Sequence, residues 1–252
     1  MKTGLFRKTL DNFLTLLYPP RCVSCGEVLP RKMQALCESC EKRFDTESKM
    51  PCPKCGKAHS KCDCVINPEL EKVKLIHVTG YDMKRDSVSR NIILRLKDDN
   101  IKSGFDFVSE RMAEALLGRI SGGYLAKNCL VTFVPRSKKA KRKAGHDQAE
   151  ILAKNISRIT GAEFADLLTN LSHKMQKKLG KEKRLENAIK SYCLKDDTLR
   201  LDGKHLIIVD DIVTTGASIE VCSRLLISAG AKDVTALVYA RTQNARVKTD
   251  II

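Results

Sequence analysis

The segment that decides the fold spans residues 207–218 and reads IIVDDIVTTGAS. Its apolar start has the pattern of a buried strand, and two adjacent carboxylates, Asp210 and Asp211, follow at once. A turn of small and hydroxyl-bearing residues then leads into an amphipathic helix. Open α/β sheets bind ligands at the carboxyl ends of their strands, so the segment predicts a binding site at this point.

The turn has the composition of a phosphate-binding loop. Backbone N–H groups at the start of a helix bind anions, and glycine allows the closest approach because it has no side chain. Asp210 and Asp211 lie one step earlier, where carboxylates accept hydrogen bonds from ribose hydroxyls. The loop lacks the Gly-Lys-Ser/Thr of nucleoside triphosphatases and the glycine triplet of dinucleotide folds. The predicted ligand-binding residues of the turn are Thr214, Thr215, Gly216, Ala217 and Ser218.

Strand and helix patterns alternate around this segment. Apolar runs predict strands over residues 73–81, 129–134, 205–209 and 234–240. Patterns with one apolar face predict helices over residues 87–97, 105–120, 148–160 and 218–229. This alternation predicts an α/β fold, with a parallel sheet covered by helices on both faces.

A cysteine-rich segment precedes the α/β part. Eight of the eleven cysteines lie between residues 22 and 64, in four close pairs. Thiols at such spacing suit a tetrahedral metal better than disulfides, so we predict two structural zinc ions. In the simplest, sequential pairing, one site is Cys22, Cys25, Cys37 and Cys40, and the other is Cys52, Cys55, Cys62 and Cys64.

Alternatives stay open for this segment. A crossed pairing fits the same four pairs, and four thiolates also hold an iron–sulfur cluster. His59 is placed to replace one thiolate, although four cysteines already suffice. The segment is too short for a core of its own, so the metals are expected to supply its folding energy. Cys129, Cys193 and Cys222 stand alone in apolar contexts and are predicted core residues.

The charge and the N-terminal segment indicate what kind of partner the protein binds and whether it is secreted or spans a membrane. The 252-residue chain carries a formal net charge of +16, which favours polyanionic partners; a solvated lysine-rich surface is the alternative. Charged and polar residues interrupt the apolar residues 5–17, so we predict neither a secretory signal nor a membrane span. A short amphipathic helix over residues 1–19 and a cytoplasmic location are expected instead.

These features resemble a known family. Residues 207–218 resemble the phosphoribosyl pyrophosphate motif of type I phosphoribosyltransferases, in which two acids and Thr-Thr-Gly connect a strand to a helix. The LYPPRCVSCG opening at Leu17, the double zinc ribbon, a Val-Pro turn, a basic run and a Gly-x-Asn/Asp-Gln element resemble the ComF family of competence proteins. A Gln-x-x-Leu…Arg-x-x-Asn pattern within residues 176–187 does so too. The resemblance covers residues 16–241.

The resemblance implies an architecture and a site. It implies a type I phosphoribosyltransferase-like parallel sheet with an N-terminal zinc-ribbon module, divided into residues 1–19, 20–67 and 68–252. The turn over residues 134–137 would bind pyrophosphate through Arg136 and Ser137, under a hood formed by residues 167–194. Asp210 and Asp211 would be the catalytic residues that orient the ribose, with Mg²⁺ accompanying the ligand.

One element departs from the family pattern. Residues 144–148 read AGHDQ where the family usually has Arg-Gly-Phe-Asn-Gln. His146 is a candidate general base, but a lone histidine in a basic loop is expected to be solvated.

Different classes of function stay open. The first is a phosphoribosyltransferase acting on a nucleobase. The second is a DNA-uptake factor whose phosphoribosyl site is a sensor or docking point. Its basic loops at residues 138–143 and 174–184 would bind single-stranded DNA. Its protein partners would be components of the DNA-uptake machinery. A ligand-responsive regulator is a third, disfavoured because no helix-turn-helix pattern stands out. Aromatic residues make up only 5% of the chain, so stacking platforms for bases are sparse.

Overall fold

The computed structural model of the protein describes residues 19–30, 35–65, 70, 73–81, 86–98, 102–171 and 191–242. The predicted helix over residues 1–19 lies almost wholly outside these ranges. The centre of the predicted hood, residues 172–190, lies outside them too, and with it the pattern at residues 176–187 and the basic loop at residues 174–184.

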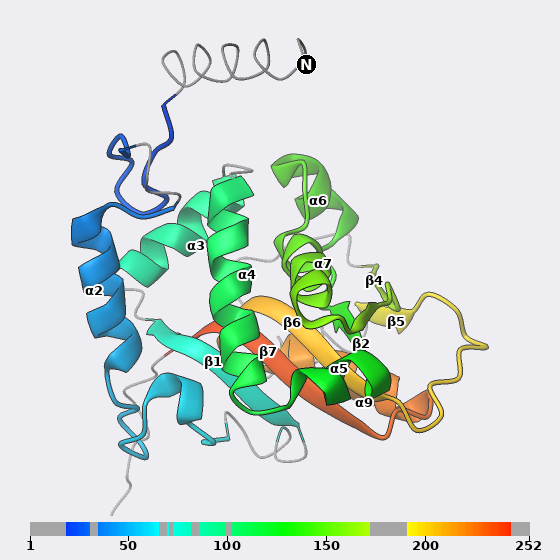
Figure 1. The fold of residues 1–252 in the computed structure, drawn as a ribbon. Helices are drawn as coiled ribbons and strands as arrows, with labels where there is room; N and C mark the ends of the chain where they lie inside the picture. The colour runs from blue at the N-terminus through cyan, green and yellow to red at the C-terminus, as the bar shows by residue number, and fades with distance from the viewer. Residues whose placement is uncertain are drawn as a thin grey trace, which may run out of the picture.

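A five-stranded parallel sheet forms the centre of the described part (Figure 1). Neighbouring strands are all parallel, as the alternation of strands and helices predicts, because a parallel neighbour is reached only by crossing over the sheet. Two further strands form a separate antiparallel pair, β4 (Leu168–Asn170) and β5 (Tyr192–Leu194). In order across the main sheet, the strands are β1 (Lys74–Tyr81), β7 (Asp233–Thr242), β6 (His205–Val213), β2 (Cys129–Phe133) and β3 (Glu163–Phe164).

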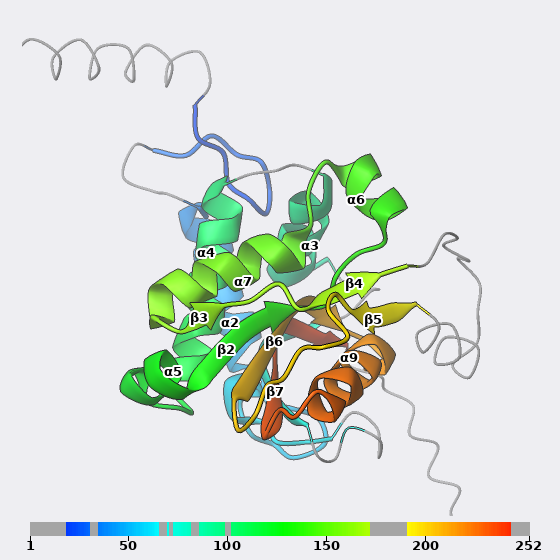
Figure 2. The same cartoon turned by 90° about the vertical axis from the view of Figure 1, so that its right-hand side faces the viewer.

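Helices cover both faces of this sheet, which confirms the predicted fold class. Figure 2 shows α4 and α7 on one side of the sheet and α9 on the other. Val209 and Tyr239 pack into the core on the first side, whereas Ile208 and Val238 pack into the core on the second. Successive residues of a strand point to opposite faces, so the central strands are apolar throughout. The helices are α2 (Glu38–Lys49), α3 (Val88–Asp98), α4 (Lys102–Leu117), α5 (Gly122–Asn128), α6 (Lys138–Ala144), α7 (Gln148–Thr160) and α9 (Ala217–Ser228), with a 3₁₀ turn η1 (His59–Lys61).

The cysteine-rich segment shares the larger of the two cores. Phe44 of α2 is buried, its ring edge-on to Phe107 at 5.2 Å and stacked on Tyr239 at 6.3 Å. Glu47 of the same helix accepts hydrogen bonds from the backbone N–H groups of Val88 and Ser89, at the start of α3. Core packing therefore adds to whatever folding energy the metals supply to this segment.

The predicted strands and helices are present, with two differences near the turn regions. β6 continues to Val213, four residues beyond the predicted strand end, because it stays paired with β7. The basic run after Ser137 is the helix α6 and not a loop. Its residues are all Lys, Arg or Ala, which favour helix. Ser137 caps its start, and Gly145, with φ +76°, ends it.

The isolated cysteines are placed as predicted in two cases of three. Cys129 and Cys222 are buried in the core, while Cys193 is only partly buried because it lies in the small β4–β5 pair. No helix within the described ranges is long and apolar enough to cross a membrane.

Candidate functional site

A cavity of about 590 Å³ opens at the carboxyl ends of β2 and β6, within the size range of small-molecule sites. Three cationic side chains and one carboxylate face it, together with hydroxyl and amide groups. Its lining residues are Lys97 of α3, Val134, Pro135, Arg136 and Ser137 of the turn after β2, Ala140, Lys143 and Ala144 at α6, Asn170 and Tyr192 of the β4–β5 pair, Asp210 of β6 and Ser218 of α9.

The two predicted acids lie within β6 and not after it. Asp210 faces the cavity, and its Oδ1 accepts a hydrogen bond from the backbone N–H of Asp211 at 2.9 Å. Burial raises the pKa of Asp210 well above its usual value, and the charge of Asp211 raises it further. The carboxylate of Asp211 lies 3.6 Å from the ammonium of Lys97. The ammonium of Lys97 therefore partly balances the negative charge of Asp211 before any ligand binds.

The predicted phosphate turn follows directly. Gly216 has φ +80° and is the residue before α9, so the left-handed backbone there favours glycine. Thr215 Oγ1 accepts from the N–H of Ala217 at 3.4 Å. Thr214 is exposed at the bend, where its carbonyl accepts from Thr242 Oγ1 at 3.4 Å. Ser218 lines the cavity, and the other four predicted residues form the turn beside it.

Arg136 and Ser137 enter the same cavity from the turn after β2. The N–H of Arg136 donates to Asp147 Oδ2 at 2.9 Å, and Asn170 Nδ2 donates to the carbonyl of Pro135 at 3.1 Å. Ser137 Oγ accepts from the N–H of Ala140 at 3.2 Å and so caps α6. Both sides of the turn are thus held by side chains from neighbouring elements.

Four lining residues with polar side chains are not among the predicted site residues: Lys97, Lys143, Asn170 and Tyr192. Tyr192 donates from its hydroxyl to Ser218 Oγ at 3.2 Å, and burial raises the pKa of Tyr192 above its usual value. These residues come from four elements: α3, α6, β4 and β5. Lys143 lies in the predicted basic loop, and Asn170 and Tyr192 lie in the predicted hood, but no local pattern singles them out as site residues. Lys97 lies outside both predicted segments and has a weaker signal, as a cation in the last turn of a predicted helix.

His146 is not solvated as expected; it is buried, with 7% of its surface exposed. Its Nε2 lies 2.9 Å from the carbonyl oxygen of Leu96, and its ring packs edge-on against Phe105 at 5.7 Å. The expectation failed because the basic run is a short helix that returns the chain to the core.

The eight clustered cysteines form two tetrads in the sequential pairing. In each tetrad the sulfur atoms all lie within 4.8 Å of one another. Four sulfurs around zinc at about 2.3 Å would be about 3.8 Å apart, and the Cys25–Cys37 and Cys55–Cys62 sulfurs are 3.7 Å apart. The donor set and its spacing therefore fit structural zinc.

Backbone hydrogen bonds favour the thiolate form of one cysteine in each tetrad, Cys22 and Cys52, whereas burial raises the pKa of Cys40 and Cys62. Burial acts to raise the pKa of the Cys22 thiol, but backbone hydrogen bonds at Cys25, Cys37 and Ser24 outweigh it and lower the pKa to about 7. Burial likewise acts to raise the pKa of the Cys52 thiol, but backbone hydrogen bonds at Lys54 and Cys55 help to lower it to about 7. A metal ligand must be deprotonated, so Cys22 and Cys52 are the thiols best prepared for binding.

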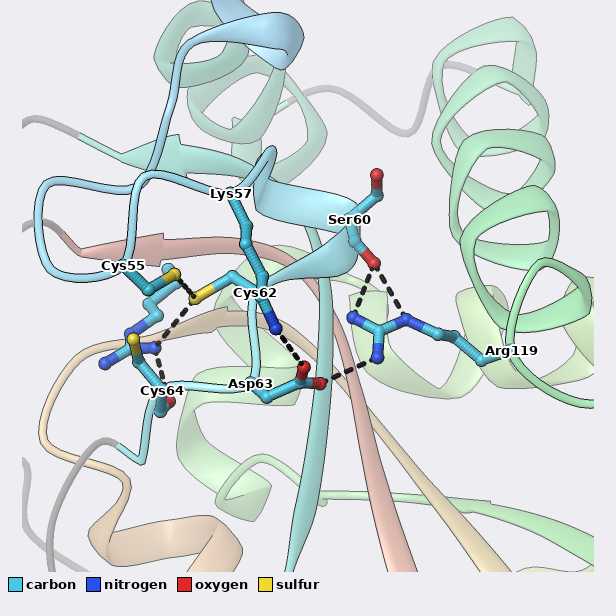
Figure 3. Close-up of polar contacts among 8 residues, drawn as sticks. Cys55, Lys57, Ser60, Cys62, Asp63, Cys64 and Arg119 are labelled. Atoms are coloured by element: carbon cyan, nitrogen blue, oxygen red, sulfur yellow. Dashed lines mark hydrogen bonds and ion pairs between the residues drawn. The ribbon is translucent and has the colours of Figure 1, made fainter.

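Arginines attach the second tetrad to the α/β part. Figure 3 shows Arg119, after α4, contacting Ser60 and Asp63 between the cysteines; the distances are 2.9 Å to the Ser60 carbonyl and 2.7 Å to Asp63 Oδ1. Arg241 of β7 donates to the carbonyl of Cys64 at 2.6 Å. His59 is not part of the tetrad; its Nδ1 lies 3.2 Å from Nε2 of His77 in the core.

Family models match both parts of the chain. A double zinc ribbon domain matches residues 13–69, and a phosphoribosyl transferase domain matches residues 145–251. The chain joins a double zinc ribbon to a phosphoribosyltransferase domain. This confirms the predicted order of a zinc-ribbon module followed by a phosphoribosyltransferase domain, and with the two tetrads it supports structural zinc.

Curated relatives match this chain over most of their length. Competence protein ComFC of Streptococcus pneumoniae (strain ATCC BAA-255 / R6) is 25% identical over 236 residues, which is 88% of this chain and 100% of the relative. DNA utilization protein YhgH of Escherichia coli (strain K12) is 24% identical over 237 residues, which is 90% of this chain and 99% of the relative. The resemblance to the ComF family is thereby confirmed. A purine phosphoribosyltransferase structure from Pyrococcus horikoshii Ot3 is 18% identical, covering 54% of this chain and 74% of that one, at a TM-score of 0.35, which carries no argument by itself.

Proposed function

We propose that the chain binds phosphoribosyl pyrophosphate, or a related ribose phosphate, in the cavity at the carboxyl end of β6, and that it serves DNA uptake or the use of imported DNA. The observation that carries the ligand proposal is that Arg136, Ser137, Asp210 and Ser218, predicted from separate motifs, line one cavity. The DNA role is supported by the relatives named as competence and DNA utilization proteins.

Each group has a role that its chemistry suits. The N–H groups at the start of α9 hold the 5′-phosphate. Asp210 and Asp211 accept hydrogen bonds from the ribose hydroxyls and oppose positive charge that develops on the sugar. Arg136 and Lys97 face the pyrophosphate, an anion that guanidinium and ammonium groups bind well. Carboxylate oxygens are also the ligands that Mg²⁺ prefers, and Mg²⁺ bound here would assist departure of pyrophosphate.

Calorimetry with Mg²⁺ tests the ligand. Asp211→Asn keeps the size of the side chain but loses its charge, and we expect it to weaken binding of phosphoribosyl pyrophosphate about tenfold or more, the usual effect of losing a charged hydrogen bond. Gly216→Val should abolish binding because the branched side chain strains the turn and fills the approach to it. Asp197→Ala, an exposed acid outside the cavity lining, is the control. Equal affinity in all of these proteins would place the ligand elsewhere.

Salt dependence tests the DNA role. Lys138, Lys139 and Arg142 are exposed on α6, next to the cavity. Each phosphate contact on a single strand contributes about 0.7 to the slope of log affinity against log salt, so changing all three to Ala should lower the slope by about 2. Lys141→Ala is the matched control and should change it less, since its ammonium lies 2.6 Å from Glu150. An affinity for single-stranded DNA that does not change with salt concentration, or no binding at all, would contradict the DNA role.

A further inference from the structure

Residues 146–148, at the junction of α6 and α7, hydrogen-bond to the backbone beside two cations of the cavity, Lys97 and Arg136. The side-chain Nε2 atoms of His146 and Gln148 lie 2.9 Å and 3.0 Å from the carbonyl oxygen of Leu96. A carbonyl oxygen can only accept, so both side chains donate to it and His146 carries a hydrogen on Nε2. Both side chains are buried, and Gln148 is only 1% exposed.

This pair of hydrogen bonds fixes the end of α3. Leu96 lies in the last turn of the helix, where carbonyl groups lack a donor within the helix. His146 and Gln148 supply two donors from another element. Lys97 is the next residue, so the same bonds fix the backbone that carries its ammonium into the cavity and to within 3.6 Å of Asp211.

Asp147, between these two residues, fixes the opposite side. Its Oδ2 accepts from the backbone N–H of Arg136 at 2.9 Å, and the residue is 3% exposed. Burial raises the pKa of Asp147, while the hydrogen bond from Arg136 opposes that shift. Three consecutive side chains thus connect to the Leu96 carbonyl, next to Lys97, on one side and to the backbone N–H of Arg136 on the other.

We propose that residues 146–148 are a clamp that sets the spacing of Lys97 and Arg136, and so decides the affinity of the site for the pyrophosphate end of its ligand. The inference rests on the proposed function, in which the 5′-phosphate is held by the turn before α9 and the second anionic group faces these two cations. His146, Asp147 and Gln148 are positioning residues in this scheme; they act through Lys97 and Arg136.

Two ligands distinguish positioning from general stability. Full-length, zinc-loaded protein is titrated with phosphoribosyl pyrophosphate and with ribose 5-phosphate, both with Mg²⁺. His146→Phe keeps the ring against Phe105 but cannot donate, and Gln148→Ala removes the second donor. One ordinary hydrogen bond corresponds to roughly fivefold in an equilibrium constant. We expect the double variant to bind phosphoribosyl pyrophosphate about tenfold more weakly, with less than about a twofold change for ribose 5-phosphate.

A thermodynamic cycle tests whether the clamp acts through Lys97. Gln148→Ala should weaken pyrophosphate binding less in a Lys97→Met background than in wild type, because interacting residues are not additive. Hydrogen exchange of the last turn of α3 should become faster in the double variant, while that of α9 should not. Ile156→Val, a change at a buried residue of α7, is the control that lowers stability without removing a hydrogen bond to the Leu96 carbonyl.

The outcomes separate the two proposals. A folded double variant that binds both ligands as wild type does, or that loses both equally, overturns the clamp. The clamp is also overturned if hydrogen exchange at the end of α3 is as slow in the double variant as in wild type, whether or not ligand is present. Wild-type protein that binds no phosphoribosyl pyrophosphate overturns the proposed function and the ligand part of the clamp, and faster exchange would then support only the contact to Leu96.

Discussion

Replacing Phe44 with Ala should destabilise the whole chain and not the cysteine-rich segment alone. Phe44 is 3% exposed, and its ring contacts the rings of Phe107 and Tyr239 in the core between the sheet and its helices. A Phe→Ala change in a core costs about 3–5 kcal/mol, because apolar surface is lost and a cavity remains. Domains are stable by only about 5–15 kcal/mol, so the loss is a large fraction of the total.

Denaturant unfolding followed by two signals measures this effect. Far-UV circular dichroism reports the α/β part, and a zinc indicator reports release of metal from the tetrads. We expect both transitions to move together to lower denaturant in Phe44→Ala. Val28→Ala changes an exposed residue of the same segment and should stay within about 0.5 kcal/mol of wild type. Early zinc release with an unchanged circular dichroism transition would refute the shared core.

Three further predictions concern the zinc content, the stability of the folded protein at low pH, and the hydrogen bonds at the start of α3. Elemental analysis should find about two zinc ions per chain, one fewer in Cys22→Ser or in Cys52→Ser, because each change removes one ligand of one tetrad; unchanged zinc content would argue against the tetrads. Burial lowers the pKa of His77 from 6.5 to about 3, so the folded state binds fewer protons than the unfolded chain and stability should fall as pH drops from about 6.5 towards 3. Chemical unfolding at pH 7 and pH 5 should show a smaller loss for His77→Gln than for wild type. Glu47→Gln should cost about 1 kcal/mol in thermal unfolding, since the carboxylate caps the start of α3 from another helix, and an unchanged melting temperature would contradict that role.

Local sequence rules predicted most of the fold. The start of the strand, the Thr-Thr-Gly turn and the helix after it fall where expected, because strand, turn and helix propensities act between neighbouring residues. The cysteine pairs are likewise close in sequence, so their spacing indicated metal sites, although it left the pairing open. The tetrads in the structure follow the sequential order.

Other features depended on contacts between distant parts of the chain. The four extra residues of β6 are strand because β7 pairs with them, and a pattern within residues 207–218 cannot include that partner. His146 is buried because α3 offers its Leu96 carbonyl fifty residues earlier in the chain.

The sequence by itself determined the class of fold, the cysteine-rich segment with its close thiol pairs, and the two motifs that contribute residues to the cavity. Only the tertiary structure decided that Arg136 and Asp210 line one cavity, that Lys97 and Tyr192 complete it, and that Phe44 belongs to the main core. The physical reason is the separation of the interacting residues along the chain. Backbone propensity and close thiol spacing act over a few residues. A cavity and a core are made by side chains that are distant in sequence and that only the folded sheet brings together.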